Sequence, residues 1–186
     1  MKIDCTTIRI NIDTAKHVAC AEHPDILTRI FWMVFPKAKK PTEVLSITPL
    51  FCKYYIAWCT SIRKTKESKK SVRFTAAMNS AINLTRKIVG VPQIHQIDVE
   101  NRFIVKDKYS QKEAQDRILE YVSRQTYKKL RGLGDVSIND FKVIYKPFYV
   151  CVCERNKKKY LRIVDAELGE RDYLLEYQYK NLQFYK

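Results

Sequence analysis

Three side chains near the N-terminus, His17, Cys20 and His23, have the types and the spacing of metal ligands. Zinc accepts imidazole and thiolate ligands, and spacings of two or three residues let one turn present several of them. A closed structural site needs a fourth ligand, and no Cys-x-x-Cys pair elsewhere supplies it. We therefore expect no bound metal, and we interpret this segment as a polar connection between two elements.

A cysteine nucleophile is the other reaction that the residue types allow. Cys151 and Cys153 lie on the same face of an expected strand, and a thiol nucleophile needs a histidine base. Nothing in the sequence brings His95 to either thiol, and the motifs of phosphate loops, serine nucleophiles and zinc proteases are absent. We expect buried thiols that act as small hydrophobic side chains, no cofactor and no enzymatic activity. A cysteine-dependent enzyme is the alternative.

Positive charge is the clearest chemical signal in the chain. There are 35 Lys and Arg residues against 20 Asp and Glu, which gives a net charge of +15, and the excess is larger in residues 1–93. This charge favours a polyanionic partner, although a lysine-rich and merely solvated surface is also possible. Two basic segments each join two expected strands. The anion-binding residues that we expect are Arg63, Lys64, Lys66, Lys69, Lys70 and Arg73 in the first segment and Arg155, Lys157, Lys158, Lys159 and Arg162 in the second.

Three aromatic side chains precede the first basic segment. Tyr54, Tyr55 and Trp58 could stack on nucleic-acid bases if they were exposed on a sheet. The alternative is that they belong to the core, since about half of the side chains of an amphipathic sheet face inward. Basic loops also prevent edge-to-edge aggregation of sheets. The sequence therefore predicts phosphate contacts, whereas it does not establish base recognition.

Hydrophobic periodicity predicts the elements that position these residues. Alternating Ile8, Ile10 and Ile12 indicate a strand, and Ser110 with Glu113 forms the capping-box pattern that opens the clearest helix. That helix should end near Gly132. We expect further strands at residues 44–47, 51–62, 72–78, 82–84, 141–145, 148–153, 160–164 and 173–177, and a short helix at 25–35.

These elements predict an α+β fold in which helices pack on antiparallel sheets. Their order is similar in the two halves of the chain, which suggests two tandem helix-plus-hairpin repeats. The best boundary is the Gly90-Val91-Pro92 segment. We expect a first α+β half at residues 1–90 and a second at 91–186, either as two domains or as one compact unit.

Residues 109–177 resemble the PepSY domain, in which a helix packs on an antiparallel sheet. The resemblance rests on the Ser-x-x-Glu-Ala helix start at 110–114, the aromatic strand at 148–150, and the segment Val164-Asp165-Ala166-Glu167-Leu168-Gly169-Glu170. Leu168 stands where the family usually has Thr. Asp165 can accept backbone N–H groups at the head of this turn, and Gly169 can supply a positive φ. The resemblance implies a non-catalytic module that binds or inhibits a partner.

The expected function is that of a non-catalytic binding protein that contacts a polyanion, nucleic acid in the first place, through basic hairpin loops. A protein-binding or inhibitory PepSY-like module is the alternative. A third possibility is binding to an anionic membrane surface through the helix at 25–35 and the cations Lys37, Lys39 and Lys40. With no apolar leader and no apolar run near the length of a membrane span, we expect a cytoplasmic protein without a transmembrane segment.

Overall fold

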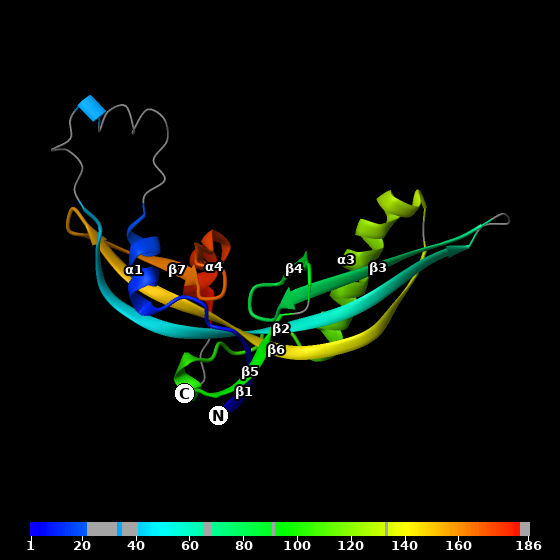
Figure 1. Cartoon of the computed structure of the whole chain (residues 1–186), viewed down its shortest axis with the longest axis horizontal. Coiled ribbons are helices and arrows are strands. Elements are labelled where there is room, and N and C mark those ends of the chain that lie inside the picture. Colours follow the sequence, from blue (N-terminus) through cyan, green and yellow to red (C-terminus); the bar gives the residue numbers. More distant parts are fainter. Residues whose placement is uncertain (22–32, 35–40, 65–67, 91, 133, 183–186) are drawn as a thin grey trace. The chain divides into compact units, whose positions relative to one another are not determined.

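The computed structural model shows an α+β chain whose strands belong to one mixed sheet (Figure 1). It describes residues 1–21, 33–34, 41–64, 68–90, 92–132 and 134–182. Most of the helix expected at 25–35, and the three cations that follow it, lie outside the described residues. Of this expected helix the structure describes Met33 and Val34, and both side chains are exposed.

The chain divides into two compact units, and each is discontinuous in sequence. Unit 1 contains residues 1–7, 51–146 and 181–186, and unit 2 contains residues 8–50 and 147–180. Two long strands, β2 (Glu43–Lys64) and β6 (Asp135–Arg155), contribute residues to both units. Neither unit coincides with residues 1–90 or 91–186, because β2 and β6 each carry the chain from one unit into the other.

Unit 1 is built on six strands in the order β4-β3-β2-β6-β1-β5. Besides β2 and β6, these strands are β1 (Lys2–Thr6), β3 (Lys69–Asn79), β4 (Leu84–Lys87) and β5 (Ile94–Asp98). The β2–β3, β3–β4 and β1–β5 pairs are antiparallel, whereas β1 pairs β6 in parallel, so the sheet is mixed. A 3-10 turn, η2 (Asn101–Phe103), precedes the single described α-helix of this unit, α3 (Gln111–Leu130).

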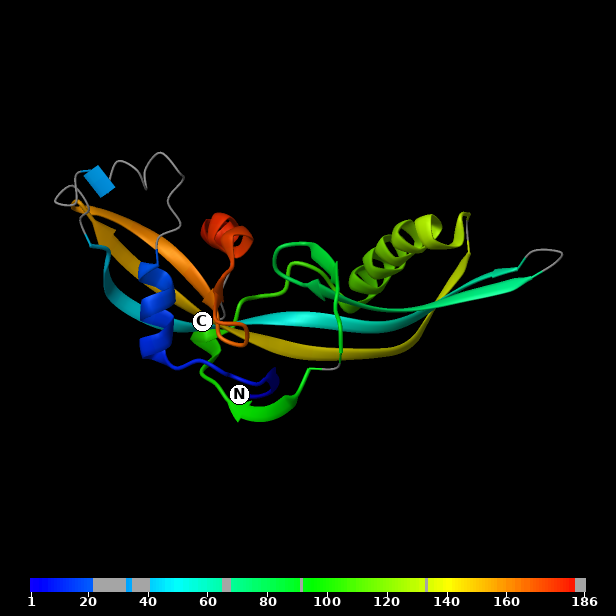
Figure 2. The same ribbon diagram turned by 45° about the horizontal axis from the view of Figure 1, so that its top comes forward.

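Helix α3 packs on β3 and β4, and Figure 2 shows it on one face of these strands. The predicted capping box is confirmed: the Ser110 side chain accepts from the Glu113 N–H, and the Glu113 carboxylate accepts from the Ser110 N–H. Ala114, Ile118 and Val122, one turn apart, are fully buried against strand residues of the core. The residues that they cover are Tyr55, Ala57, Cys59, Phe74, Ala76 and Met78.

Unit 2 combines α1 (Ile12–Cys20) and α4 (Tyr173–Gln178) with β7 (Lys158–Asp165) and β8 (Glu170–Arg171). A 3-10 turn, η3 (Tyr179–Asn181), follows α4. Strand β7 pairs antiparallel with both β6 and β8. The core of this unit packs Ala15 and Ala19 of α1 against Cys151, Cys153 and Val164. The small alanines let the helix approach the strands closely, and the cysteines act there as hydrophobic side chains.

Two predicted strands are wrong. The alternating isoleucines at 8–12 do not form a strand, because Asn11 caps α1 by accepting a hydrogen bond from the Thr14 N–H at 2.8 Å. Residues 173–177 form α4, which Asp172 caps through the Leu175 N–H at 2.9 Å. Both errors have one cause: a side-chain cap outweighed a residue pattern that suits a strand.

The strand expected at 82–84 is displaced: residues 81–83 form a turn, and only Leu84 lies in β4. Other expected strands are present but merge. The segments at 44–47 and 51–62 are parts of β2, and those at 141–145 and 148–153 are parts of β6, which continues through Pro147. The predicted turn between β7 and β8 is confirmed. The Asp165 carboxylate accepts from the N–H groups of Glu167 and Leu168 at 2.9 and 3.0 Å, and Gly169 has a φ of 71°.

Candidate nucleic-acid interface

The β2–β3 hairpin places cations opposite one another. Lys64 pairs with Lys69 across the two strands, and Arg63 pairs with Lys70. Like charges at directly opposite positions of antiparallel strands repel. Strand β3 carries no acidic side chain that would compensate this repulsion. The hairpin therefore concentrates positive charge in a way that an anionic ligand would relieve.

The guanidinium of Arg63, unlike the other cations that the structure describes in this hairpin, is hydrogen-bonded to backbone carbonyl groups. Its Nη1 donates to the carbonyl oxygen of Leu130 at 2.6 Å and also to that of Arg131, at the C-terminal end of α3. Gly132 permits this approach, because a Cβ there would lie 2.6 Å from the Arg63 Cζ. The last carbonyl groups of a helix have no hydrogen-bond donor within the helix, and a guanidinium can donate to them. Its positive charge also interacts favourably with the helix dipole. Arg63 is a helix cap, and its role as an anion-binding residue stays a prediction.

Arg162 has the same role in unit 2. Its Nη1 donates to the carbonyl oxygen of Ala21 at 3.0 Å and to that of Ala19, at the C-terminal end of α1. The guanidinium also lies over the ring of Tyr160, 5.2 Å from the centroid. This arginine likewise caps a helix end, and its role in anion binding stays a prediction.

The remaining predicted cations are exposed at the two hairpins. They are Lys64, Lys69, Lys70 and Arg73 in unit 1 and Lys157, Lys158 and Lys159 in unit 2. None of these seven forms an ion pair with another residue that the structure describes. Arg155, at the end of β6, is half-buried, and Lys66 lies outside the described residues.

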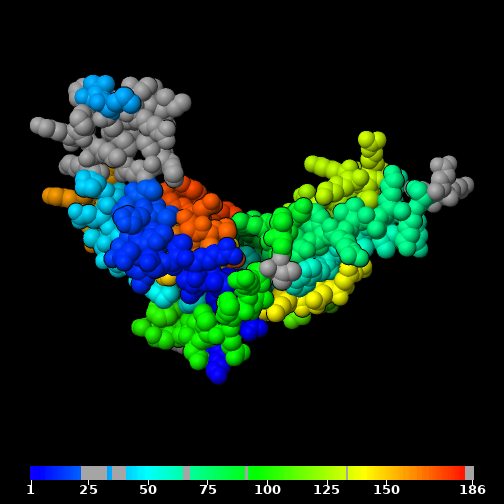
Figure 3. Space-filling view, viewed as in Figure 1, coloured from blue at the N-terminus to red at the C-terminus, as the bar shows by residue number. Residues whose placement is uncertain are grey.

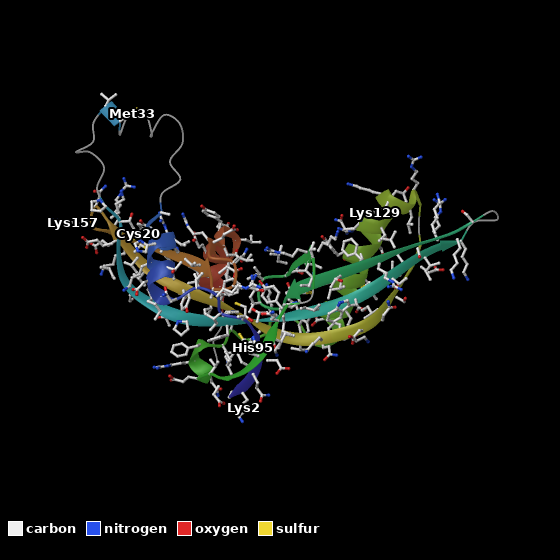
Figure 4. The ribbon with its side chains drawn as sticks, in the orientation of Figure 1. Lys2, Cys20, Met33, His95, Lys129 and Lys157 are labelled. Atoms are coloured by element: carbon white, nitrogen blue, oxygen red, sulfur yellow. The ribbon has the colours of Figure 1, made fainter. Side chains whose placement is uncertain are left out.

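The β6–β7 hairpin turns tightly through Asn156 and Lys157. Their φ values are 51° and 63°, positive at both central positions as a type I′ turn requires. Asparagine tolerates this conformation, whereas a lysine does so at a cost of about 1–2 kcal/mol that glycine would avoid. Figure 4 labels Lys157 at this tip. The chain thus keeps a cation at a position where glycine is more stable.

Two of the three predicted stacking residues lie in the core. Tyr54 is 7% exposed and Tyr55 is 4% exposed. The Tyr55 ring stacks on Phe141 with centroids 5.7 Å apart, and its hydroxyl donates to the Tyr109 carbonyl at 3.3 Å. Neither ring is available to a ligand in this conformation, so both predictions are corrected. Trp58 is half-buried and remains a candidate.

Unit 1 also holds cations that the sequence did not single out. The amino groups of Lys87 and Lys129 lie 5.6 and 5.9 Å from the centroid of the Phe74 ring. Lys128, beside Lys129, is exposed, as is Arg131. Figure 4 labels Lys129 on α3, and Figure 3 shows the surfaces of α3, β3 and β4 next to one another. A basic last helical turn is visible in sequence, but only the packing of α3 on β3 shows which strands it adjoins.

A polar cluster at one end of the β2–β3 pair was also missed. Lys53 forms an ion pair with Asp107, whose other oxygen accepts from the Ser80 hydroxyl at 2.8 Å. Desolvation alone would lower the pKa of Lys53, but the hydrogen bond and charge of Asp107 raise it above its ordinary value. The cluster holds the 79–83 turn to the segment before α3, and its serine is fully buried. Its role is structural.

The thiols and histidines offer little chemistry. Cys5 lies opposite His95 in the β1–β5 pair, but Cys5 is only 1% exposed, which keeps its sulfur from a solute. Burial raises the pKa of Cys59 to about 11 and of Cys151 to about 12, so these thiols are protonated at neutral pH.

Of the three candidate metal ligands, Cys20 lies near two buried thiols: its charge adds to the burial that raises the pKa of Cys151 and of Cys153. His17 is exposed, the Cys20 thiol donates to the Thr42 carbonyl at 3.2 Å, and His23 lies outside the described residues. Among the described residues, no group of His, Cys, Asp and Glu side chains could hold a metal ion.

Comparisons of the chain with protein-family models, with curated proteins and with solved structures each gave no match. The PepSY resemblance therefore stays a prediction. In the described part of the chain, no helix combines the length and the apolar character needed to cross a bilayer.

Proposed function

We propose that this protein is a non-catalytic binding protein for nucleic acid and that unit 1 carries the principal contact surface. The observation that carries the proposal is the cationic end of the β2–β3 hairpin, where Lys64, Lys69, Lys70 and Arg73 are exposed without an acidic partner in the described chain. Lysine and arginine on such a surface release counterions from a phosphate backbone when they bind it. The exposed cations Lys128, Lys129 and Arg131 at the C-terminal end of α3 add further positive charge to unit 1.

The proposal predicts an affinity that falls steeply with salt. For each phosphate contact, the slope of log affinity against log salt is about −0.9 on duplex DNA and about −0.7 on a single strand. We would replace all four hairpin cations by glutamine and measure binding to both forms by fluorescence anisotropy at several salt concentrations. The slope should become shallower by about 0.7 to 0.9 for each phosphate that the variant no longer neutralises.

A matched variant controls for the change in net charge. It replaces four exposed cations of unit 1 that lie away from the hairpin: Lys2, Arg102, Lys108 and Lys112. This variant should keep most of the affinity and of the salt dependence. Equal losses in both variants would show a general charge effect, and an affinity that does not change with salt would refute nucleic-acid binding.

A second candidate function, protein binding, is favoured by the surface of unit 2. Ile8, Ile12 and Leu168 are exposed, and the Arg9 and Ile10 N–H groups donate to the Ala166 carbonyl, which joins their segment to the 165–169 turn. The PepSY resemblance covers this same turn. A Leu168→Lys variant should then lose a partner that the wild-type protein retains in affinity capture, whereas the glutamine variant of the β2–β3 hairpin should keep it.

The order of the elements supports the predicted internal repeat. A strand, a helix and three strands occur as β1, α1, β2, β3, β4 and again as β5, α3, β6, β7, β8. If the two halves arose by duplication, each unit would pair the helix of one half with the hairpin of the other.

A further inference from the structure

The face of the β2–β3 hairpin opposite α3 carries a half-buried tryptophan. Side chains of a strand alternate between its two faces, and Tyr55, Ala57 and Cys59 point into the core under α3. Trp58 therefore points to the opposite face. On that face Tyr54 and Ile56 are buried, but Trp58, Thr60 and Ile62 are each partly exposed. The face thus opens toward solvent from Trp58 to the tip of the hairpin.

The register of the two strands places three cations on this same face. Trp58 is opposite Thr75, Thr60 is opposite Arg73, and Lys64 is opposite Lys69. Directly opposite residues of an antiparallel pair share a face, and Arg73 is the diagonal neighbour of Trp58 at a distance of about 7–8 Å. We call this surface the Trp58 face; it comprises Trp58, Thr60, Ile62, Lys64, Lys69, Arg73 and Thr75.

Two side chains of the Trp58 face are open to a ligand. Neither the Trp58 indole nor the Arg73 guanidinium makes a hydrogen bond, ion pair or ring contact with a described residue. Asn139 of β6 donates to the Thr60 hydroxyl at 2.6 Å, and the Asp140 carboxylate accepts from the Phe141 N–H at 2.8 Å. Amphipathic rings that remain half-exposed beside cations are typical of surfaces that bind nucleic-acid strands.

We propose that the Trp58 face binds single-stranded nucleic acid, with a base stacked on the indole of Trp58 and phosphates bound by Arg73, Lys64 and Lys69. This inference rests on the proposed function and adds the form of nucleic acid. An unpaired base exposes its flat face to an aromatic side chain, whereas the bases of a duplex are stacked on one another. From Trp58 to Lys64 the strand extends about 20 Å at its usual rise per residue, enough for several nucleotides.

The fluorescence of Trp58 gives a direct test. Trp32 and Trp58 are the two tryptophans of the chain, so a Trp32→Phe protein reports on Trp58 alone. Titration with a short oligothymidylate should quench this emission, whereas a duplex of equal length should quench it much less. In the same background, Trp58→Leu should weaken the affinity for the single strand about 5-fold to 150-fold, and the duplex affinity should change little.

Two further variants keep the test decisive. Trp58→Phe retains an aromatic ring and should retain most of the single-strand affinity, which also covers the case that Trp58→Leu folds poorly. Tyr127→Leu removes an exposed aromatic ring from α3, on the other side of the hairpin, and should leave the affinity unchanged.

The outcomes separate this inference from the proposed function. Salt-dependent binding without quenching, and with equal affinity in Trp58→Leu, overturns the Trp58 face and leaves nucleic-acid binding standing. A higher affinity for the duplex than for the single strand would likewise overturn the Trp58 face and leave nucleic-acid binding standing. If the wild-type protein binds neither form at low salt, the proposed function fails and the inference fails with it.

Discussion

In unit 1 the C-terminal carbonyls of α3 accept hydrogen bonds from Arg63, and in unit 2 those of α1 accept them from Arg162. Each arginine comes from a strand of one chain half and caps a helix of the other half. The surfaces around these two similar caps differ. Unit 1 exposes cations at its hairpin, whereas unit 2 exposes Leu168 at the 165–169 turn and Tyr177 on α4 as well as its basic turn.

The comparison shows that a basic residue in the sequence does not by itself provide an anion-binding side chain in the fold. Arg63 and Lys64 are neighbours in sequence, but one satisfies a helix end and the other is exposed. Counting charges along the chain therefore overestimates the charge that a ligand can reach. On the surfaces that remain we base the proposals of a nucleic-acid contact for unit 1 and a protein contact for unit 2.

The largest effects should come from the two cores. Ile118 of α3 and Leu175 of α4 are both fully buried. Truncation of either to alanine should lower the free energy of unfolding by about 2–5 kcal/mol, because a cavity adds to the lost burial. Urea denaturation measures this loss. Hydrogen exchange should then show Ile118→Ala loosening α3 and β3 more than α1 and β7, with Leu175→Ala doing the reverse; uniform loosening would mean that the units do not act separately.

Removal of the helix-capping arginines should have the next largest effect. Arg63→Ala and Arg162→Ala each leave two carbonyls without their charged donor, and we expect each to lower the free energy of unfolding by about 1.5–3 kcal/mol. The exposed neighbours provide controls: Lys64→Ala and Lys159→Ala should stay within about 0.5 kcal/mol of wild type. If Arg63→Ala mainly weakened nucleic-acid binding at unchanged stability, its assignment as a cap would be wrong.

Alkaline pH should distinguish the buried thiols of the two units. Burial raises the pKa of Cys151 in unit 2 to about 12 and that of Cys59 in unit 1 to about 11. The unfolded chain ionises these thiols near pH 8.5, so it releases protons that the folded chain keeps. Their contribution to stability is thus complete below about pH 8.5 and is lost as the pH rises toward the folded pKa values.

Denaturation curves in this alkaline range provide the measurement. Cys151→Ala should show a smaller loss of stability with rising pH than the wild-type protein, and Cys59→Ala should show a more modest reduction of that loss. Parallel curves for all three proteins would mean that neither thiol is held protonated by burial.

The smallest effect concerns the turn of the β6–β7 hairpin. Lys157→Gly should raise the free energy of unfolding by about 1 kcal/mol, because glycine adopts the positive φ without strain. Lys158→Gly, one residue into β7, should instead lower it by about 0.5–1 kcal/mol. The same Lys157→Gly protein tests Lys157 as part of a secondary anion site in unit 2: unchanged binding would mean that this cation makes no contact with the ligand.

Several parts of the fold could be predicted from sequence because they depend on neighbouring residues. The capping box of Ser110 and Glu113 and the turn at Asp165 and Gly169 use groups that are at most four residues apart. The strands at 8–12 and 173–177 were predicted wrongly, since Asn11 and Asp172 cap helices there. The candidate site could be predicted only in part, because its cations are visible in the sequence whereas the groups that basic side chains contact in the fold are not.

The sequence by itself determined the net charge, the positions of the two basic hairpins, the start of α3 and the chemistry available to the chain. Tertiary structure alone decided which helix lies on which hairpin, that Arg63 and Arg162 cap helices, and that Tyr54 and Tyr55 are buried whereas Trp58 is partly exposed. The reason is that caps and turns form within a few residues, whereas burial and charge pairing depend on side chains brought together from distant segments. Whether a cation or a ring can meet a ligand is therefore a property of the folded chain.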